Sequence, residues 1–215
     1  MQRIKTLSEY FKKYELSEKD PEKFWSEIAD SFIWKKKWDN VLKSDFENAD
    51  FKWFQNAQLN ITENIFERNL SERADKTAII WEPNDPKESP IYLSYKELYK
   101  QTCTFSNALR SKGIKKGDRV IIYMPMVPEA AIAMLACARV GAVHSVVFAG
   151  FSAASLADRI NDCEAKMVLT SDGNFRGNKT IPVKDVVDEA LEKCSSIESV
   201  IAVSYTHLRA HETCL

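Results

Sequence analysis

From residue 117 onward, short apolar runs alternate with segments whose apolar residues recur at helical spacing. The runs are GDRVIIYM at 117–124, AVHSVVF at 142–148, KMVLTS at 166–171 and SVIAV at 199–203. Short apolar runs bounded by turn residues predict buried strands, and the segments between them predict helices. Strands joined by such short helical crossovers form right-handed βαβ units in a parallel sheet covered on both faces. The predicted fold class is α/β.

The first 116 residues carry helix signals instead. Asp20 followed by Pro21 predicts a helix start, and apolar residues at helical spacing continue from it as far as Ile33. This helix needs a larger body to cover its apolar face. Further helix starts with a capping partner three residues on are predicted at Asn60-Ile-Thr-Glu63 and at Ser94-Tyr-Lys-Glu97, the second helix ending near Gly113.

Composition narrows the class of protein. The 215 residues include 30 basic and 31 acidic side chains, so charge gives no case for a nucleic-acid or membrane partner. No apolar run approaches the roughly 18 residues of a membrane span, and the first twenty residues contain no apolar signal core. Five widely spaced cysteines without a CxxC pair indicate buried, reduced thiols. These features predict a cytoplasmic protein.

Two segments follow strand ends, where open parallel sheets bind their ligands. In the first, Phe148-Ala-Gly-Phe-Ser152, Gly150 permits close backbone approach or a positive φ, and Ser152 begins a helix whose free N–H groups favour anions. Residue types alone favour a simpler interpretation, a tight turn followed by an N-cap.

The second segment is predicted to be a loop, Asp172-Gly-Asn-Phe-Arg-Gly-Asn-Lys179, continuing to Pro182. Arg176 and Lys179 lie three apart around a glycine, an arrangement suited to a phosphate. The alternative is an exposed loop with solvated charges, which the residue types again favour. The chain contains no GxGxxG, no GxxxxGK[ST] and no Ser/His/Asp set. The residues alone therefore predict an α/β domain that binds a ligand, with these two segments as the candidate binding loops.

The stretch GDRVIIYMPMVPEAAIAMLACARVGAVHSVVFAGFSAASLADRI resembles the adenylate-forming acyl-CoA synthetase family. The resemblance covers about residues 1–203 and includes FKWF at 51–54, LNITENIFERNL at 59–70, WEPND at 81–85 and LSYKEL at 93–98. YMPM…PE followed by ACARVGAVHSVVF is typical of the branch that activates acetate or propionate. The expected fold is the parallel-sheet amino-terminal portion of the family's large domain, truncated, with a helical arm ahead of it.

The resemblance implies a two-step ligation. Acetate attacks the α-phosphate of ATP with Mg²⁺, releasing pyrophosphate, and the thiol of coenzyme A (CoA) then displaces AMP from the acetyl-adenylate. The family's CoA-binding residues match two sets here: Arg176, Gly177, Asn178 and Lys179 at the phosphorylated nucleotide end, and Phe148 with Gly150 at the adenine. This implication overturns the simpler interpretations of both segments. The family usually has Arg where Lys179 stands, so affinity at that position is expected to be weaker.

The family's phosphate loop, acetate pocket and adenylation lysine have no match in this chain. We therefore expect an inactive amino-terminal portion, with an arm at 1–58 and the first part of the AMP-binding domain at 59–203, and no catalytic residue. Acetate, ATP and CoA are the expected small-molecule partners. The alternatives are a propionate-selective ligase and a stand-alone, non-catalytic nucleotide- or CoA-binding module.

The last twelve residues, SYTHLRAHETCL, follow the point where the resemblance stops. His207, His211 and Cys214 could supply three zinc ligands, but a structural zinc site takes four. The segment also resembles a translated adapter or vector end. Residues 204–215 are interpreted as a non-native tail, and no metal site is predicted.

Overall fold

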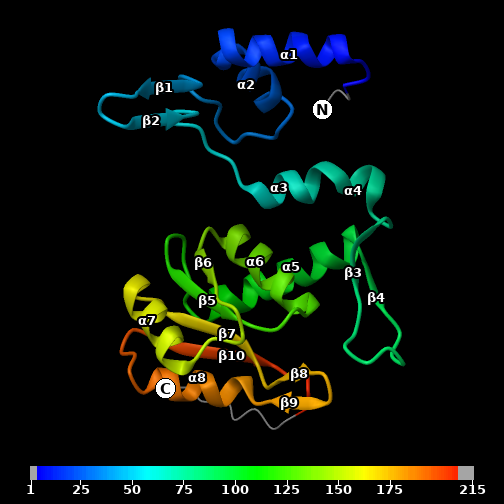
Figure 1. Ribbon diagram of the computed structural model, residues 1–215, viewed down its shortest axis with the longest axis vertical. Helices are drawn as coiled ribbons and strands as arrows, with labels where there is room; N and C mark the ends of the chain where they lie inside the picture. The colour runs from blue at the N-terminus through cyan, green and yellow to red at the C-terminus, as the bar shows by residue number, and fades with distance from the viewer. Residues whose placement is uncertain (1–3, 208–215) are drawn as a thin grey trace. The chain divides into compact units, whose positions relative to one another are not determined.

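The computed structural model describes residues 4–207 and divides into two compact units, Met1–Arg68 and Asn69–Leu215. The sequence interpretation placed the end of the arm ten residues earlier, at 58. Each unit is described by itself below, with the elements labelled in Figure 1.

The first unit combines helices with one hairpin. Its elements are α1 (Leu7–Lys19), α2 (Pro21–Ala29), β1 (Leu42–Asp45), β2 (Asp50–Trp53) and α3 (Ile61–Ile65), and α4 (Glu67–Arg73) crosses the division. The Asp20 carboxylate accepts the N–H of Lys23 at 3.0 Å, so α2 begins where the sequence predicted. The helix ends at Ala29, short of the predicted Ile33. The backbone N–H of Ile33 donates instead to the side-chain oxygen of Asn64. The sequence pattern missed α1 and the β1–β2 hairpin.

The second unit is built around a parallel sheet. Four strands, β5 (Arg119–Tyr123), β6 (Val143–Val146), β7 (Met167–Ser171) and β10 (Ser199–Val203), lie in the order β10-β7-β5-β6 with all pairings parallel. The helices of this unit are α5 (Tyr95–Ser111), α6 (Pro128–Val140), α7 (Ala153–Cys163) and α8 (Val183–Leu191). All four predicted strands, and the α/β class, are confirmed.

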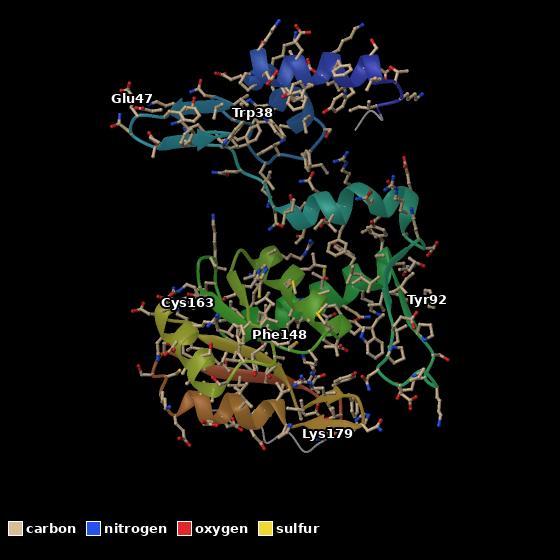
Figure 2. All side chains as sticks on the ribbon, in the orientation of Figure 1. Trp38, Glu47, Tyr92, Phe148, Cys163 and Lys179 are labelled. Atoms are coloured by element: carbon tan, nitrogen blue, oxygen red, sulfur yellow. The ribbon has the colours of Figure 1, made fainter. Side chains whose placement is uncertain are left out.

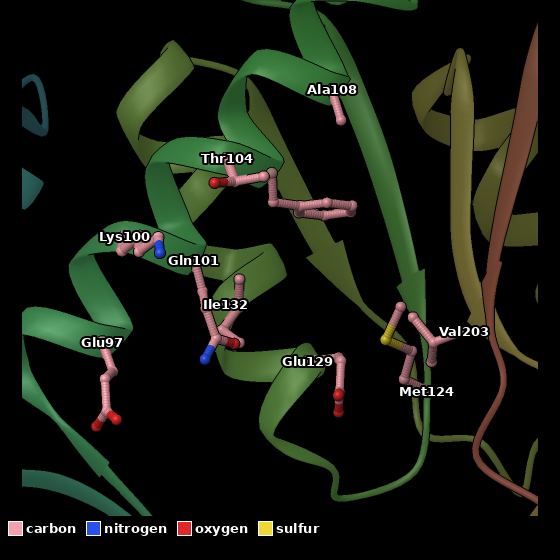
Figure 3. A pocket seen from close by; sticks show the side chains of 10 residues that line it. Glu97, Lys100, Gln101, Thr104, Ala108, Met124, Glu129, Ile132 and Val203 are labelled. Carbon is pink, nitrogen blue, oxygen red and sulfur yellow. The ribbon is translucent and has the colours of Figure 1, made fainter.

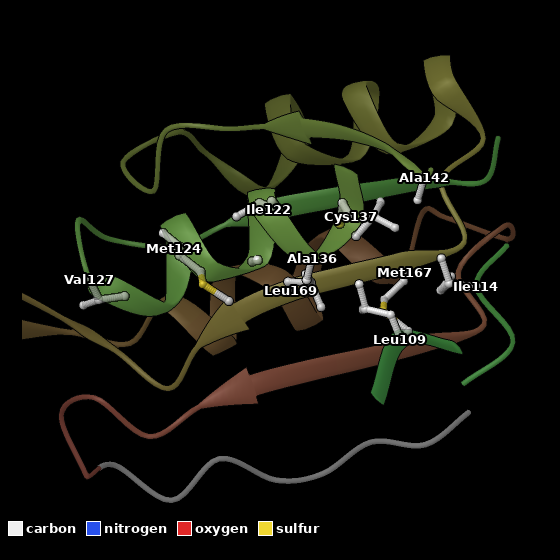
Figure 4. Packing of buried hydrophobic residues seen from close by; sticks show 13 residues of the cluster. Leu109, Ile114, Ile122, Met124, Val127, Ala136, Cys137, Ala142, Met167 and Leu169 are labelled. Carbon is white, nitrogen blue, oxygen red and sulfur yellow. The ribbon is translucent and has the colours of Figure 1, made fainter. Parts of the chain in front are cut away.

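Helices cover both faces of this sheet. Val120 and Ile122 of β5 pack with α5 and α6 on one face, whereas Ile121 and Tyr123 pack with α7 and α8 on the other. Alternate strand residues point to opposite faces, so a continuous apolar run is what a doubly covered strand requires. Figure 4 shows the first of these two clusters, where Cys137 and Ala136 of α6 lie over the strands.

The helix ends follow the sequence signals closely. Ser94 and Glu97 form the predicted capping box of α5, and the Ser152 hydroxyl accepts the N–H of Ser155 at the start of α7. Gly141, at φ +85°, ends α6 in the left-handed region that glycine adopts without strain. The Ser152 cap places the start of α7 at the carboxyl edge of the sheet, whereas Gly141 returns the chain to the amino edge, where β6 begins.

Two hairpins depart from the sequence interpretation. The segment predicted as a loop from 172 to 182 contains an antiparallel hairpin, β8 (Asn174–Arg176) and β9 (Lys179–Ile181). Three-residue strands are too short to give a visible alternation, so the loop prediction was wrong here. The hairpin of β3 (Thr77–Trp81) and β4 (Ile91–Ser94) was not predicted either.

Among residues 4–207, no helix is both long and apolar enough to cross a membrane. The four cysteines in that range are free thiols, as predicted, but only Cys137 is fully buried. Burial raises the pKa of the Cys137 thiol to about 12, so it stays protonated at neutral pH. Cys103, Cys163 and Cys194 are partly exposed, which corrects the expectation of buried thiols.

Candidate functional site

A cavity of about 930 Å³ lies at the carboxyl edge of the parallel sheet. Three segments that follow strands contribute to it: 124–126 after β5, 146–150 from the end of β6, and 174–176 beyond β7. Parallel strands end at the same edge, and the connections after β5 and β7 leave toward opposite faces of the sheet. The cavity therefore occupies the position where open α/β sheets bind their ligands.

Phe148 presents an apolar ring at this cavity. Its side chain is 72% exposed, and a Cβ atom on Gly150 would approach the Phe148 ring to 2.5 Å. Gly150 is therefore required for close approach by the ring rather than for a positive φ, the other possibility left open by the sequence. The Tyr123 hydroxyl donates to the carbonyl of Phe151 at 2.7 Å, which attaches this turn to the sheet.

Arg176 and Lys179 face each other across the β8–β9 hairpin. They are cross-strand partners flanking the two-residue turn Gly177-Asn178, and Gly177 has φ +58°. Glycine at the first position of such a turn permits the tight reversal. Directly opposed residues project from the same face of a hairpin with Cβ atoms about 5 Å apart. Figure 2 marks Lys179 on this hairpin, together with Phe148 in the same unit.

The two cations of the hairpin have no carboxylate partner among the residues that the structure describes. Both side chains are exposed, and no ion pair involves Arg176 or Lys179 within residues 4–207. Like charges directly opposite each other destabilise a hairpin. The repulsion between these two side chains lowers the stability of the hairpin, and an anionic ligand bound between them would remove that repulsion.

The six residues predicted as a binding site divide among three places. Phe148, Gly150 and Arg176 line the 930 Å³ cavity. Gly177 and Asn178 line an adjoining cavity of about 650 Å³, which shares Asn84, Phe175 and Tyr205 with the first. Lys179 lines neither cavity and joins the set only as the cross-strand partner of Arg176.

The loop between β3 and β4 also reaches this site, which sequence reasoning missed. The Trp81 indole N–H donates to the carbonyl of Met126 at 2.7 Å, and the Asn84 side-chain amide donates to the carbonyl of Gly177 at 3.3 Å. WEPND at 81–85 was noticed only as part of the family resemblance. The β-branched and aromatic residues of TAIIW and IYLS, separated by the turn residues of 82–90, are the signal that could have indicated a hairpin there.

Asp172 lies beneath the hairpin and is 2% exposed. Its Oδ1 accepts backbone N–H groups from Gly173, Tyr205 and Thr206 at 2.8–2.9 Å. Burial raises the pKa of this carboxyl group, but these N–H donors outweigh burial and hold the pKa below its usual value. The ionised carboxylate thus fixes the chain as it leaves both β7 and β10.

A third cavity, of about 470 Å³, lies between α5 and α6 (Figure 3). Phe105, Ala108, Met124, Ile132 and Val203 give it an apolar lining, with Glu97, Lys100 and Glu129 among the polar side chains. None of the residues predicted to bind a ligand lines it. It is a less suitable place for a phosphorylated nucleotide than the carboxyl edge.

Side chains that could bind a metal ion do not cluster in the described part of the chain. No group of three or more His, Cys, Asp or Glu side chains there could hold a metal ion. Of the zinc ligands considered from the sequence, His207 is described, and its ring lies 3.4 Å from the Ser204 hydroxyl. His211 and Cys214 lie outside the described residues.

Comparisons with known proteins assign both parts of the chain. Residues 66–214 match the family model of the AMP-binding enzymes, and residues 10–65 match that of the acetyl-coenzyme A synthetase N-terminus. The chain is 53% identical over 198 residues to an acetyl-coenzyme A synthetase of Syntrophobacter fumaroxidans, covering 92% of this chain and 30% of that protein. It is 47% identical over 201 residues to acetyl-coenzyme A synthetase 2 of Pseudomonas putida, covering 94% and 31%.

A solved structure supports the fold independently. The acetoacetyl-CoA synthetase from Streptomyces lividans superposes with a TM-score of 0.84 at 27% identity, over 91% of this chain and 30% of that one. The chain thus spans about 30% of the length of the relatives it matches.

Proposed function

Because the chain belongs to the AMP-binding enzymes and corresponds to the amino-terminal region of acetyl-coenzyme A synthetases, we propose that it is part of an acetate–CoA ligase. That enzyme would convert acetate, ATP and CoA to acetyl-CoA, AMP and pyrophosphate through acetyl-adenylate. The part described here would contribute to the CoA site and not to adenylation.

The observation that carries the proposal is the pair Arg176 and Lys179 at the carboxyl edge of the sheet. Two opposed cations without carboxylate partners suit a phosphate group, since arginine offers a planar fork of donors and lysine a point charge. The phosphorylated nucleotide end of CoA is such a ligand. Gly177 and Asn178 hold the two cations at the tight turn.

The adenine of CoA would lie against Phe148. An exposed aromatic ring offers an apolar face, and Gly150 leaves the room that the ring occupies. The 930 Å³ cavity connects this ring with Arg176, so one ligand can contact both. Glu82 also lines the cavity and would keep an anionic group toward the Arg176 side.

ATP, Mg²⁺ and acetate would bind mainly to residues in the remaining length of the relatives. The acid pocket that distinguishes acetate from propionate would lie there too, so a propionyl-CoA synthetase is the nearest alternative. A non-catalytic CoA-binding module is the alternative from another class of protein.

We further propose the domain limits 1–58 for the arm, 59–203 for the first part of the AMP-binding domain, and 204–215 for a non-native tail. Two facts are relevant to whether residues 204–215 are native. The family match extends to residue 214, and the Tyr205 ring packs edge-on to Trp81 and Phe175. Resequencing the locus tests the tail directly, because a native gene would reproduce SYTHLRAHETCL and continue the family pattern around it.

The function is tested on the complete product of the resequenced locus. We expect acetate-dependent exchange of pyrophosphate into ATP, and CoA-dependent formation of acetyl-CoA. Faster turnover with propionate than with acetate would favour the propionyl enzyme. CoA binding without any exchange would favour the non-catalytic module and contradict the ligase.

A further inference from the structure

We propose that Asn84 is a positioning residue of the CoA site, acting through the turn that carries Arg176 and Lys179. This inference rests on the proposed function. It concerns the loop between β3 and β4, residues 82–90, for which the residue pattern predicted no role.

The loop is attached to the site at two points. At its base, the Trp81 indole N–H donates to the Met126 carbonyl at 2.7 Å, just beyond the end of β5. Farther along, the Asn84 side-chain amide donates to the Gly177 carbonyl at 3.3 Å, inside the two-residue turn. Neither contact involves residues 204–215, so the attachment does not depend on the origin of that segment.

The Gly177 carbonyl is a sensitive position for such a contact. The hairpin strands are only three residues long, and a ladder of that length holds its turn weakly. Arg176 and Lys179 also repel each other directly beside the turn. A donor supplied from outside the hairpin offsets both effects, and it fixes the turn from which both cations project.

Asn84 also lines two cavities whose charged side chains differ. It lines the 930 Å³ cavity that contains Arg176 and the 650 Å³ cavity that contains Asp85, Lys87 and Glu88. The charge of Glu88 contributes, after burial, to the raised pKa of Tyr205 in the second cavity. Two carboxylates against one lysine leave the second cavity with a net negative charge, whereas Glu82 and Arg176 balance each other in the first. The ligand's phosphate is therefore directed to the Arg176 side of the first cavity.

The test is a double-mutant cycle on CoA affinity, measured by isothermal titration with the complete product of the resequenced locus. Asn84→Ala should weaken CoA binding roughly two- to tenfold, the range expected for one neutral hydrogen bond. The same change in the Arg176→Ala/Lys179→Ala background should have no effect, because Asn84 acts through those two side chains. A purely structural role would lower affinity in both backgrounds.

Two further variants complete the design. Asn84→Gln retains an amide donor on an exposed loop and should restore most of the affinity. Ser89 lies on the same loop and lines neither cavity. The Ser89→Ala variant should therefore bind CoA as tightly as the unmodified protein. Unchanged affinity in Asn84→Ala would overturn the role of Asn84. A chain whose CoA affinity is unaffected by Arg176→Ala/Lys179→Ala would instead overturn the placement of the CoA site itself.

Discussion

The two edges of the parallel sheet use their cations differently. At the amino edge, Arg119 donates to the carbonyls of Cys163 and Glu164 at 2.6 and 2.9 Å, where α7 ends. Lys166 there pairs with Asp118 at 3.0 Å. At the carboxyl edge, Arg176 and Lys179 oppose each other across a hairpin turn and form no ion pair within the described range.

Under the proposed function, this difference distinguishes cations that stabilise the fold from cations that bind a ligand. The amino edge also has a cavity, of about 380 Å³, but its Arg119 and Lys166 are satisfied by carbonyls and carboxylates of the protein. A cation near the end of a helix stabilises it through its dipole. Size and charge of a cavity are therefore weaker guides than whether its charged groups already have partners.

The largest expected effect is on the carboxyl edge. Arg176→Ala/Lys179→Ala should lower CoA affinity by roughly 100-fold or more, because each cation supplies a charge-assisted contact of about 1.5–3 kcal/mol. Stability should not fall, since the opposed charges gain nothing from each other. Titration calorimetry and thermal unfolding measure the two quantities. Arg110→Ala, which removes an exposed arginine away from the cavities, should leave CoA affinity unchanged.

In the complete enzyme, Arg176→Ala alone should separate the two half-reactions. The apparent KM for CoA should rise roughly tenfold or more, for the loss of one charge-assisted contact. Acetate-dependent pyrophosphate exchange should stay nearly unchanged, because in the proposed reaction CoA acts only after the adenylate has formed. Equal loss in both half-reactions would contradict the assignment of Arg176 to the CoA site.

The opposite outcome is expected at the amino edge. Arg119→Ala removes two hydrogen bonds to the end of α7 and should lower the free energy of unfolding by about 1–3 kcal/mol. The fraction that remains folded should bind CoA normally. Urea denaturation and titration calorimetry on the same sample give both values, and a selective loss of CoA affinity would erase the distinction between the edges.

A smaller effect is expected from Gly150→Ala. The added Cβ would displace the Phe148 ring, which is exposed and free to rotate, so the fold should be retained. Loss of the apolar wall should weaken CoA binding roughly fivefold or more, as expected for one base–aromatic contact of about 1–3 kcal/mol. Phe148→Ala is the companion variant and should give a similar loss. Unchanged affinity in both would remove Phe148 from the site.

The smallest effect concerns pH at the amino edge. The backbone N–H of Lys115, followed by the Lys166 ammonium, lowers the pKa of Asp118 below its ordinary value. Asp118 therefore stabilises the fold above its unfolded pKa of about 3.9, and this contribution is lost as pH falls through the lower folded pKa. Asp118→Asn should be less stable than the unmodified chain at pH 7 and should lose less stability on acidification. The measurement is urea denaturation of both proteins at pH 7 and at acidic pH. An equal loss of stability on acidification in the two proteins would contradict this prediction.

The sequence predicted the central sheet well because its two inner strands, β5 and β7, are buried on both faces. A run such as VIIY is apolar at every position, so it stands out without any knowledge of its neighbours. The capping signals at Asp20, Ser94 and Ser152 are equally local, and all three act as predicted.

The hairpins were harder because their strands are short and half exposed. β8 has three residues, and its pairing with β9 depends on contacts that no local pattern displays. The same limit hid Asn84, whose hydrogen-bond partner Gly177 lies 93 residues away in sequence. Family resemblance selected Arg176 and Lys179 for the site, whereas their opposed placement and the approach of the Phe148 ring to Gly150 required the structure.

The central claim is that Arg176 and Lys179 form a phosphate site for CoA. The most direct measurement compares the affinity of the unmodified chain for CoA and for 3′-dephospho-CoA, which lacks one phosphate and is otherwise identical. We expect CoA to bind at least tenfold more tightly, and the difference to disappear in Arg176→Ala/Lys179→Ala. Equal affinity for the two ligands in the unmodified chain would contradict the account.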